Sequence, residues 1–138
     1  MTGEPLVPFE RTLESHLHRE TQEMTDERVL ATMSVDDQPV LQPMGIVHGG
    51  VYAWMAEGMT SEATFKAVYP DGNVAVGMAN QTSFLRPISK GTIHADGRAR
   101  HRGRTTWLWE VDFTDDDGHL CAVTRVTIAV RPIPASGS

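Results

Sequence analysis

Apolar and polar residues alternate along much of the second half of the chain. The clearest stretch is TTWLWEVDF at 105–113, where four large apolar residues occupy every second position. Alternation with a period of two is typical of a strand with one buried face. Comparable stretches predict four further strands, at residues 28–35, 74–88, 92–101 and 120–130. The segment DDDGH at 115–119 predicts a hairpin turn before the last of them.

A longer period marks residues 49–68, GGVYAWMAEGMTSEATFKAV. Val51, Met55 and Met59 recur every four positions with other apolar residues between them. This pattern predicts a long helix that is buried on more than one side. The segment YPDGN that follows is a strong turn and ends the helix.

A weaker helical period runs through residues 9–24, with Phe9, Leu13 and Leu17 four apart. We therefore expect a short helix near the N-terminus. The whole order, a helix, a strand, a long helix and four more strands, predicts an α+β fold in which a sheet of about five strands curls around one central helix. We expect one domain over residues 1–138, with an N-terminal helical extension at 1–27 and a frayed tail at 132–138.

Length and composition limit the classes of function. The chain has 138 residues, 40% of them hydrophobic, which suits one globular domain. It has no apolar run long enough to cross a membrane, and its first residues lack the pattern of a signal peptide. Cys121 is the one cysteine and has no partner for an internal disulfide. We expect a cytoplasmic protein without a membrane partner.

The charges are unevenly distributed. The net charge is −6, and nine of the 18 acidic residues lie in the first 40 positions. In contrast, RARHRGR at 98–104 holds four arginines. Guanidinium groups at a strand end suit phosphate binding, although a solvated surface of salt bridges explains them equally well. No aromatic residue interleaves the arginines, so nucleic acid is disfavoured as a partner.

Chemistry is concentrated at the start of the long helix, in QPMGIVHGG at 42–50. Amide groups at a helix N-terminus have no partner inside the helix, and glycine leaves them accessible. Gly49 and Gly50 could therefore bind an anion or polarise a carbonyl oxygen. The alternative is that the two glycines only form a tight turn.

Two further residues near this start are candidates for chemistry. Glu57 lies among apolar residues on the same helical face as Ser61, and such an acid is costly unless it is paired or used. It could instead reach solvent or an arginine. His48 could polarise a substrate or hold the loop. No set of Cys and His residues has the spacing of a metal site, and hydrolase-elbow, P-loop and dinucleotide motifs are absent from the sequence, so we expect no metal and no cofactor.

These features together resemble the hotdog-fold acyl-CoA thioesterases of the PaaI type, on the branch that includes 4-hydroxybenzoyl-CoA and 1,4-dihydroxy-2-naphthoyl-CoA thioesterases. The resemblance covers about residues 28–131. Its segments are QPMGIVHGGVYAWMAEGMTS at 42–61, VGMANQTSFLRPISKG at 76–91 and the strands within 101–130. Its specific part is the spacing from Gln42 through His48, Gly49 and Gly50 to Glu57. The N-terminal 27 residues lie outside it.

The resemblance implies a role for each matching position. Glu57 holds the place of the catalytic carboxylate, and Gly49 that of the glycine whose N–H binds the thioester oxygen. Gln42 and His48 match polar residues near the thioester, and Ser61 matches a hydroxyl one turn past the acid. The resemblance also implies a homo-oligomer, commonly a tetramer.

Helix geometry independently predicts at least a dimer. Gly49 and Glu57 are eight residues apart, which is about 12 Å along one helix. One carbonyl cannot lie within about 3 Å of both groups in the same chain. Gly49 of one subunit must therefore work with Glu57 of another.

The arginines are candidates for binding coenzyme A, whose phosphates need positive charge on an acidic protein. We expect Arg102 and Arg104, on either side of Gly103, to make these contacts, with Arg86 as a weaker candidate. The leading hypothesis is then hydrolysis of an acyl- or aroyl-CoA, with Glu57 acting as nucleophile or as general base. The alternatives are a non-catalytic acyl-CoA sensor and, below it, a hotdog hydratase or dehydratase.

Overall fold

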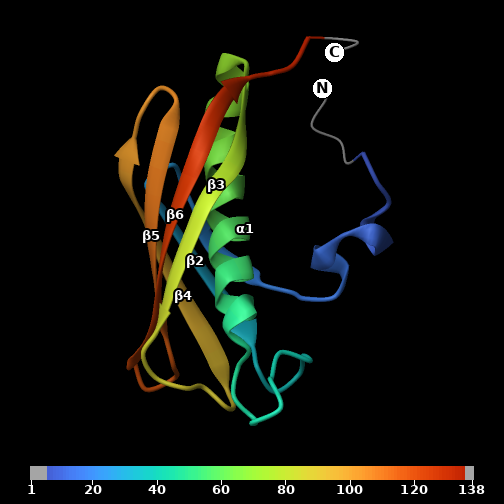
Figure 1. Cartoon of the computed structure of the whole chain (residues 1–138), viewed down its shortest axis with the longest axis vertical. Helices are drawn as coiled ribbons and strands as arrows, with labels where there is room; N and C mark the ends of the chain where they lie inside the picture. Colours follow the sequence, from blue (N-terminus) through green and yellow to red (C-terminus); the bar gives the residue numbers. More distant parts are fainter. Residues whose placement is uncertain (1–5, 136–138) are drawn as a thin grey trace.

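The computed structural model describes residues 6–135, in which one long helix packs against a single twisted sheet (Figure 1). All strand pairs are antiparallel, and the spatial order is β1-β2-β4-β5-β6-β3. The strands are β1 (Glu20–Met24), β2 (Arg28–Ser34), β3 (Asn73–Phe84), β4 (Thr92–Arg102), β5 (Thr106–Thr114) and β6 (Leu120–Pro132). The helix is α1 (Gly49–Val68), and single 3₁₀ turns form η1 (Phe9–Arg11), η2 (Leu13–Ser15) and η3 (Tyr69–Asp71).

The predicted α+β class, the long helix with its predicted bounds, and the five strands predicted from alternation are all present. The predicted helix over residues 9–24 is wrong. Thr12 has an extended backbone between η1 and η2, which breaks the helical run. Residues 20–24 pair instead with β2 and add a sixth strand, because that sheet edge offers partners for their backbone groups. Residues 1–5 of the expected extension and 136–138 of the expected tail lie outside the described part of the chain.

The core lies between α1 and the inner face of the sheet. Trp107, Trp109, Val111 and Phe113 all point inward from β5 and are buried, as their alternation predicts. The helix meets them with positions from Met55 to Ala63 on one face. The opposite face of α1 carries Glu57 and remains partly open.

One buried hydrogen bond ties the helix to the sheet. The Trp109 Nε1–H donates to Thr64 Oγ1 at 2.9 Å, and the Thr64 hydroxyl donates to the Thr60 carbonyl at 2.8 Å. All three side chains are buried. The pair satisfies the one polar group that Trp109 brings into the core.

The strand β3 is an edge of the sheet, and it carries three large exposed apolar side chains. Val76, Met78 and Phe84 are each more than half exposed. Its pairing with β6 shifts register between Gly77 and Ala79, which marks a bulge. Exposed apolar residues along a long, unpaired edge are typical of a surface that another chain covers.

Candidate active site

The start of α1 is capped by its own sequence. His48 is the N-cap residue, and its Nδ1 accepts a hydrogen bond of 2.9 Å from the Gly50 N–H. A backbone N–H can only donate, so Nδ1 carries no proton and the neutral ring holds its proton on Nε2. The exposed imidazole can therefore donate from Nε2 to a ligand. Gly50, in contrast, has its amide occupied by this cap.

Gly49 presents the amide that the cap leaves over. None of the hydrogen bonds recorded between described residues uses the Gly49 N–H. The Phe84 ring lies close to this glycine, since a Cβ at this position would lie 2.6 Å from Cζ of Phe84 and the ring would have to move. The Phe84 ring thus covers the first residue of the helix. A free amide at the positive end of a helix, beside an apolar ring, is suited to a developing negative charge.

A pocket of about 440 Å³ opens beside this amide. Its walls are mostly apolar, and its lining residues are Gln42, Ile46, Val47, Gly49, Tyr52, Phe84, Leu85, Arg86, Pro87 and Cys121. Burial raises the pKa of Tyr52 to about 12. Burial also raises the pKa of the Cys121 thiol, whose Sγ lies 3.2 Å from the His119 carbonyl. Both groups are therefore neutral at physiological pH.

Gln42 is held at the rim of this pocket by its own loop. Its backbone N–H donates to the Ile46 carbonyl at 2.8 Å, and its side-chain Oε1 accepts from the Met44 N–H. The oxygen of the amide is thereby fixed in the loop, so the NH₂ group is the part available to a ligand. The structure therefore brings Gln42, His48 and Gly49 to one end of the helix, as the sequence predicts.

Glu57 lies elsewhere, two turns along α1 and on the face turned away from the core. Its carboxylate packs against β3, where a Cβ on Gly77 would lie 2.9 Å from Glu57 Oε1. It lines two pockets, one along β3 and one of about 420 Å³ on the outer side of α1. Neither shares a lining residue with the pocket at Gly49. Within one chain, the two groups thus face different spaces.

Ser61 lies one turn beyond Glu57 and lines the outer pocket with it. Its hydroxyl oxygen is buried and has no hydrogen-bond partner. Every other buried side-chain oxygen or nitrogen among the described residues has one. Such a group is costly unless a ligand supplies the partner.

The candidate arginines separate into two places. Arg86 lines the pocket at Gly49 and lies 3.9 Å from Asp115, with more than half of its side chain exposed. Arg102, Gly103 and Arg104 form the turn between β4 and β5, at the opposite end of the molecule from the start of α1 (Figure 1). Arg102 is already bound to Asp26 at 2.7 Å and to Glu27 at 3.4 Å.

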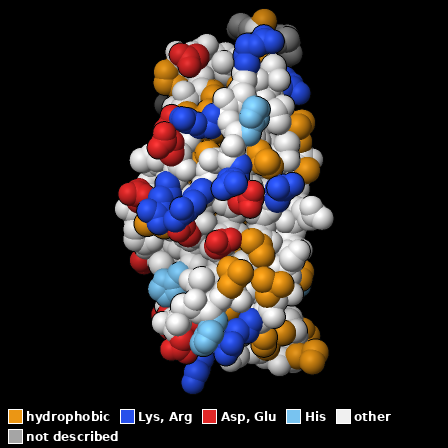
Figure 2. All heavy atoms as spheres, turned by 90° about the vertical axis from the view of Figure 1, so that its left-hand side faces the viewer, with side chains coloured by type: hydrophobic (Ala, Val, Ile, Leu, Met, Phe, Trp, Pro, Cys, Tyr) orange, Lys and Arg blue, Asp and Glu red, His pale blue; other side chains and the backbone are white. Residues whose placement is uncertain are grey.

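The remaining arginines of 98–104 belong to a mixed surface. Arg98 pairs with Asp96 at 3.3 Å, and Arg100 pairs with Glu110 at 3.4 Å. Figure 2 shows this outer face of the sheet, where Lys and Arg side chains lie among Asp and Glu side chains. The salt-bridged surface therefore accounts for these two residues.

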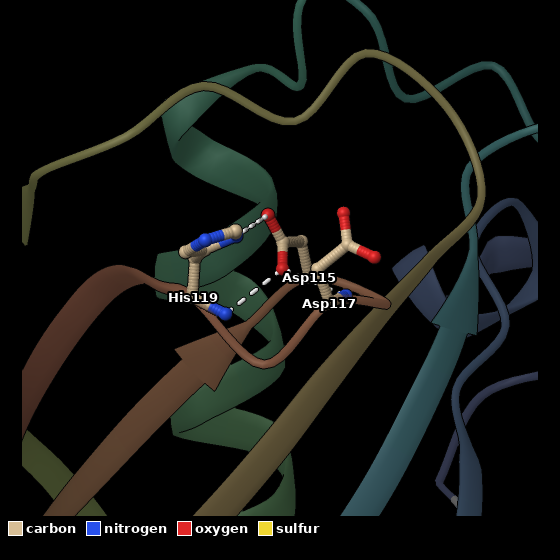
Figure 3. A group of neighbouring side chains, drawn as sticks. All are labelled: Asp115, Asp117 and His119. Carbon is tan, nitrogen blue, oxygen red and sulfur yellow. Dashed lines mark hydrogen bonds and ion pairs between the residues drawn. The ribbon is translucent and has the colours of Figure 1, made fainter.

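The turn between β5 and β6 gathers Asp115, Asp117 and His119 (Figure 3). The Asp115 carboxylate accepts from the backbone N–H groups of His119 and Asp117, at 2.9 and 3.0 Å. These bonds, led by that from His119, lower the pKa of Asp115. The His119 ring lies 3.2 Å from the other carboxylate oxygen. Turn formation explains the cluster, which also fixes Asp115 beside Arg86.

Three residues of the site were not predicted from the sequence. In the sequence, Phe84 and Tyr52 cannot be distinguished from ordinary apolar residues. In the structure their ring centroids lie 6.1 Å apart, and both rings line the pocket at Gly49. Arg19 was assigned to an extension without a role, yet it lines the pocket of Glu57. No local signal separates it from a surface arginine.

Comparison with known proteins identifies the family. The model of the thioesterase superfamily matches residues 44–122, more than half of the chain. The proofreading thioesterase EntH of Cronobacter turicensis is 34% identical over 119 residues, covering 86% of this chain and 85% of that protein.

Solved structures show the same relationship. A thioesterase from Haemophilus influenzae superposes with a TM-score of 0.82 at 30% identity, covering 93% of this chain and 88% of that one. A variant of the Pseudomonas aeruginosa thioesterase PA1618 gives 0.82 at 31% identity, covering 90% and 88%. The chain therefore belongs to the thioesterase superfamily and has the hotdog fold.

Proposed function

We propose that this protein is an acyl-CoA thioesterase of the PaaI type, in which a glutamate, Glu57, supplies the catalytic carboxylate. The observation that carries the proposal is the unoccupied Gly49 amide at the start of α1, beside an apolar pocket and capped by His48. The names of its relatives support thioester hydrolysis. The match to Gln42, Gly49, Glu57 and Ser61 supports the particular branch.

In this proposal the thioester carbonyl accepts a hydrogen bond from the Gly49 N–H, with His48 Nε2–H and the Gln42 amide close by. Glu57 of a second copy lies on the other side of the carbonyl. It either attacks the carbon to form an anhydride, which water then opens, or removes a proton from an attacking water. In both routes the C–S bond breaks, coenzyme A leaves as its thiol after taking up a proton, and the acid is released.

The second copy is required because Gly49 and Glu57 face different pockets of one chain. The apolar edge of β3 supports the contact, since Glu57 packs against Gly77 in the middle of this strand. A two-fold pairing through β3 would form two equivalent sites. The proposed assembly is a homodimer at minimum, with the tetramer implied by the family resemblance.

Coenzyme A would extend from Gly49 through the adjoining pocket, with its phosphates near Arg86. Arg102 and Arg104 lie at the far end of the same chain, so in this proposal they reach coenzyme A only across the subunit contact. No helix in the described part of the chain is long and apolar enough to cross a membrane. The cytoplasmic location stays a prediction.

Release of free thiol from a panel of acyl- and aroyl-CoA thioesters, followed with a thiol-reactive dye, tests the function. If the protein is an acyl-CoA thioesterase, it releases thiol from at least one of these substrates, and the Glu57→Gln variant loses this activity. Tight binding of acyl-CoA without thiol release by the wild-type protein would contradict the proposal and support the non-catalytic sensor.

A further inference from the structure

The N-terminal segment supplies one wall of the pocket that contains Glu57. Arg19 lies across the helix at Gly58, where a Cβ would be 3.5 Å from its Nε. Its side chain is 16% exposed, and its Nη2 donates to Glu62 Oε2 at 3.3 Å. The other end of the fork, Nη1, donates to Thr21 Oγ1 at 3.0 Å. Arg19 is thus held in one place by contacts to both β1 and α1.

The pocket beneath Arg19 combines hydrogen-bond donors, carboxylates and one apolar wall. It has a volume of about 420 Å³, and its lining residues are Glu14, Arg19, Trp54, Glu57, Gly58, Ser61 and Glu62. The half-buried Trp54 gives one apolar wall. The buried Ser61 hydroxyl lacks a partner, and a guanidinium has five N–H donors, of which the recorded contacts to Thr21 and Glu62 engage two. The pocket therefore offers both donors and acceptors beyond Glu57.

Charge decides what kind of group fits there. Three acidic residues, Glu14, Glu57 and Glu62, line the pocket together with one arginine, Arg19. A carboxylate on the ligand would meet this excess of negative charge, and a plain hydrocarbon would leave the Ser61 hydroxyl without a partner and engage none of the remaining N–H groups of Arg19. A neutral hydroxyl can accept from Arg19 or Ser61 and donate to Glu62.

We propose that Arg19, Glu62 and Ser61 form a specificity site for the distal end of the acyl group, which selects a neutral hydrogen-bonding substituent over hydrocarbon and over carboxylate. The inference rests on the proposed thioesterase activity of Glu57. The distances agree with it, since Glu62 lies five residues beyond Glu57, about 7.5 Å along the helix. An acyl chain of six carbons spans a similar length from its carbonyl to its end.

Three coenzyme A thioesters of equal chain length test the selection: hexanoyl-CoA, 6-hydroxyhexanoyl-CoA and adipyl-CoA. For the wild-type protein, kcat/KM for the hydroxylated substrate should exceed that for hexanoyl-CoA by about tenfold, the worth of about 1.4 kcal/mol of hydrogen bonding. Adipyl-CoA should be the poorest of the three. In Arg19→Met and Glu62→Met, which remove the hydrogen-bonding groups, the ratio of kcat/KM for the hydroxylated substrate to kcat/KM for hexanoyl-CoA should fall towards one.

Arg100→Met is the matched control, because Arg100 makes a comparable ion pair on the outer face of the sheet and should leave the preference unchanged. Thermal unfolding identifies a variant that fails to fold, and Glu62→Met then tests the site if Arg19→Met is the variant that fails. Equal kcat/KM for the three substrates, or a preference that both variants retain, overturns this inference alone. Absence of thiol release from every acyl-CoA tested overturns the proposed function, and this inference with it.

Discussion

The replacement Gly49→Pro removes the backbone N–H from the candidate oxyanion site and puts the Cδ of the proline ring in place of its hydrogen. Gly49 is the first residue of α1, a position that proline occupies without loss of a helical hydrogen bond. His48 before it has φ −63° and ψ 132°, the extended region that a residue preceding proline prefers. The cap from the Gly50 N–H to His48 Nδ1 uses neither altered atom. The helix should therefore start as it does in the wild type.

The contact with Phe84 needs a separate control. Any Cβ at position 49 would lie 2.6 Å from Phe84 Cζ, so the ring must move in every variant. Phe84 is 61% exposed, which gives the ring room to do so. Gly49→Ala introduces the same Cβ and keeps the N–H. The ratio of kcat between the alanine and proline variants thus measures the loss of the N–H, together with the ring carbon that replaces its hydrogen.

Loss of one oxyanion-hole donor typically lowers kcat by about 10²–10³-fold, or about 3–4 kcal/mol. We expect that ratio between Gly49→Ala and Gly49→Pro, measured as thiol release at saturating acyl-CoA. Thermal unfolding should show that both variants fold. Equal kcat values for the two folded variants would refute the assignment of the Gly49 amide.

Three further outcomes follow from the same geometry. Glu57→Gln should lower kcat at least about a hundredfold. Mixing this variant with Gly49→Pro should restore about a quarter of wild-type activity, since about half of the randomly formed dimers are then heterodimers with one intact site of two. No recovery from proven heterodimers would contradict a shared site. Arg86→Ala should raise KM for acyl-CoA more than it lowers kcat, with a smaller effect at high salt, and an unchanged KM would remove Arg86 from the binding site. Thr64→Val should lower the free energy of unfolding by about 1–3 kcal/mol, because the Trp109 N–H would remain buried without a partner; Thr64→Ser keeps the hydroxyl and should lose less, and equal melting temperatures for the two variants would show that this bond contributes little.

The sequence was sufficient where a feature depends on local pattern. The bounds of α1 follow from the two glycines at its start, a turn after it and a regular apolar repeat within it, and the buried face of β5 follows from simple alternation. The cap of His48 on Gly50 joins residues two apart, so its surroundings were also within reach of the sequence.

Features that depend on distant contacts could not be predicted. Residues 20–24 lie at the end of a segment whose apolar residues are spaced as in a helix. They form a strand because the edge of β2 offers partners for their backbone groups. Arg19 meets Glu62 across 43 positions, and Phe84 meets Gly49 across 35, so neither contact leaves a mark in the local pattern. The bulge between Ala99 and His101 likewise changes which arginines share a face of β4.

The two edges of the sheet differ in a way that limits assembly. β3 is twelve residues long and carries three large exposed apolar side chains, whereas β1 has five residues, is almost entirely polar and contains an irregularity between Thr21 and Glu23. Pairing through β3 would leave a β1 strand at each end of the combined sheet. Short, charged and interrupted edges resist the addition of further strands. In such a pair the β1 edges would block the addition of further chains, which favours a closed dimer over an open fibre.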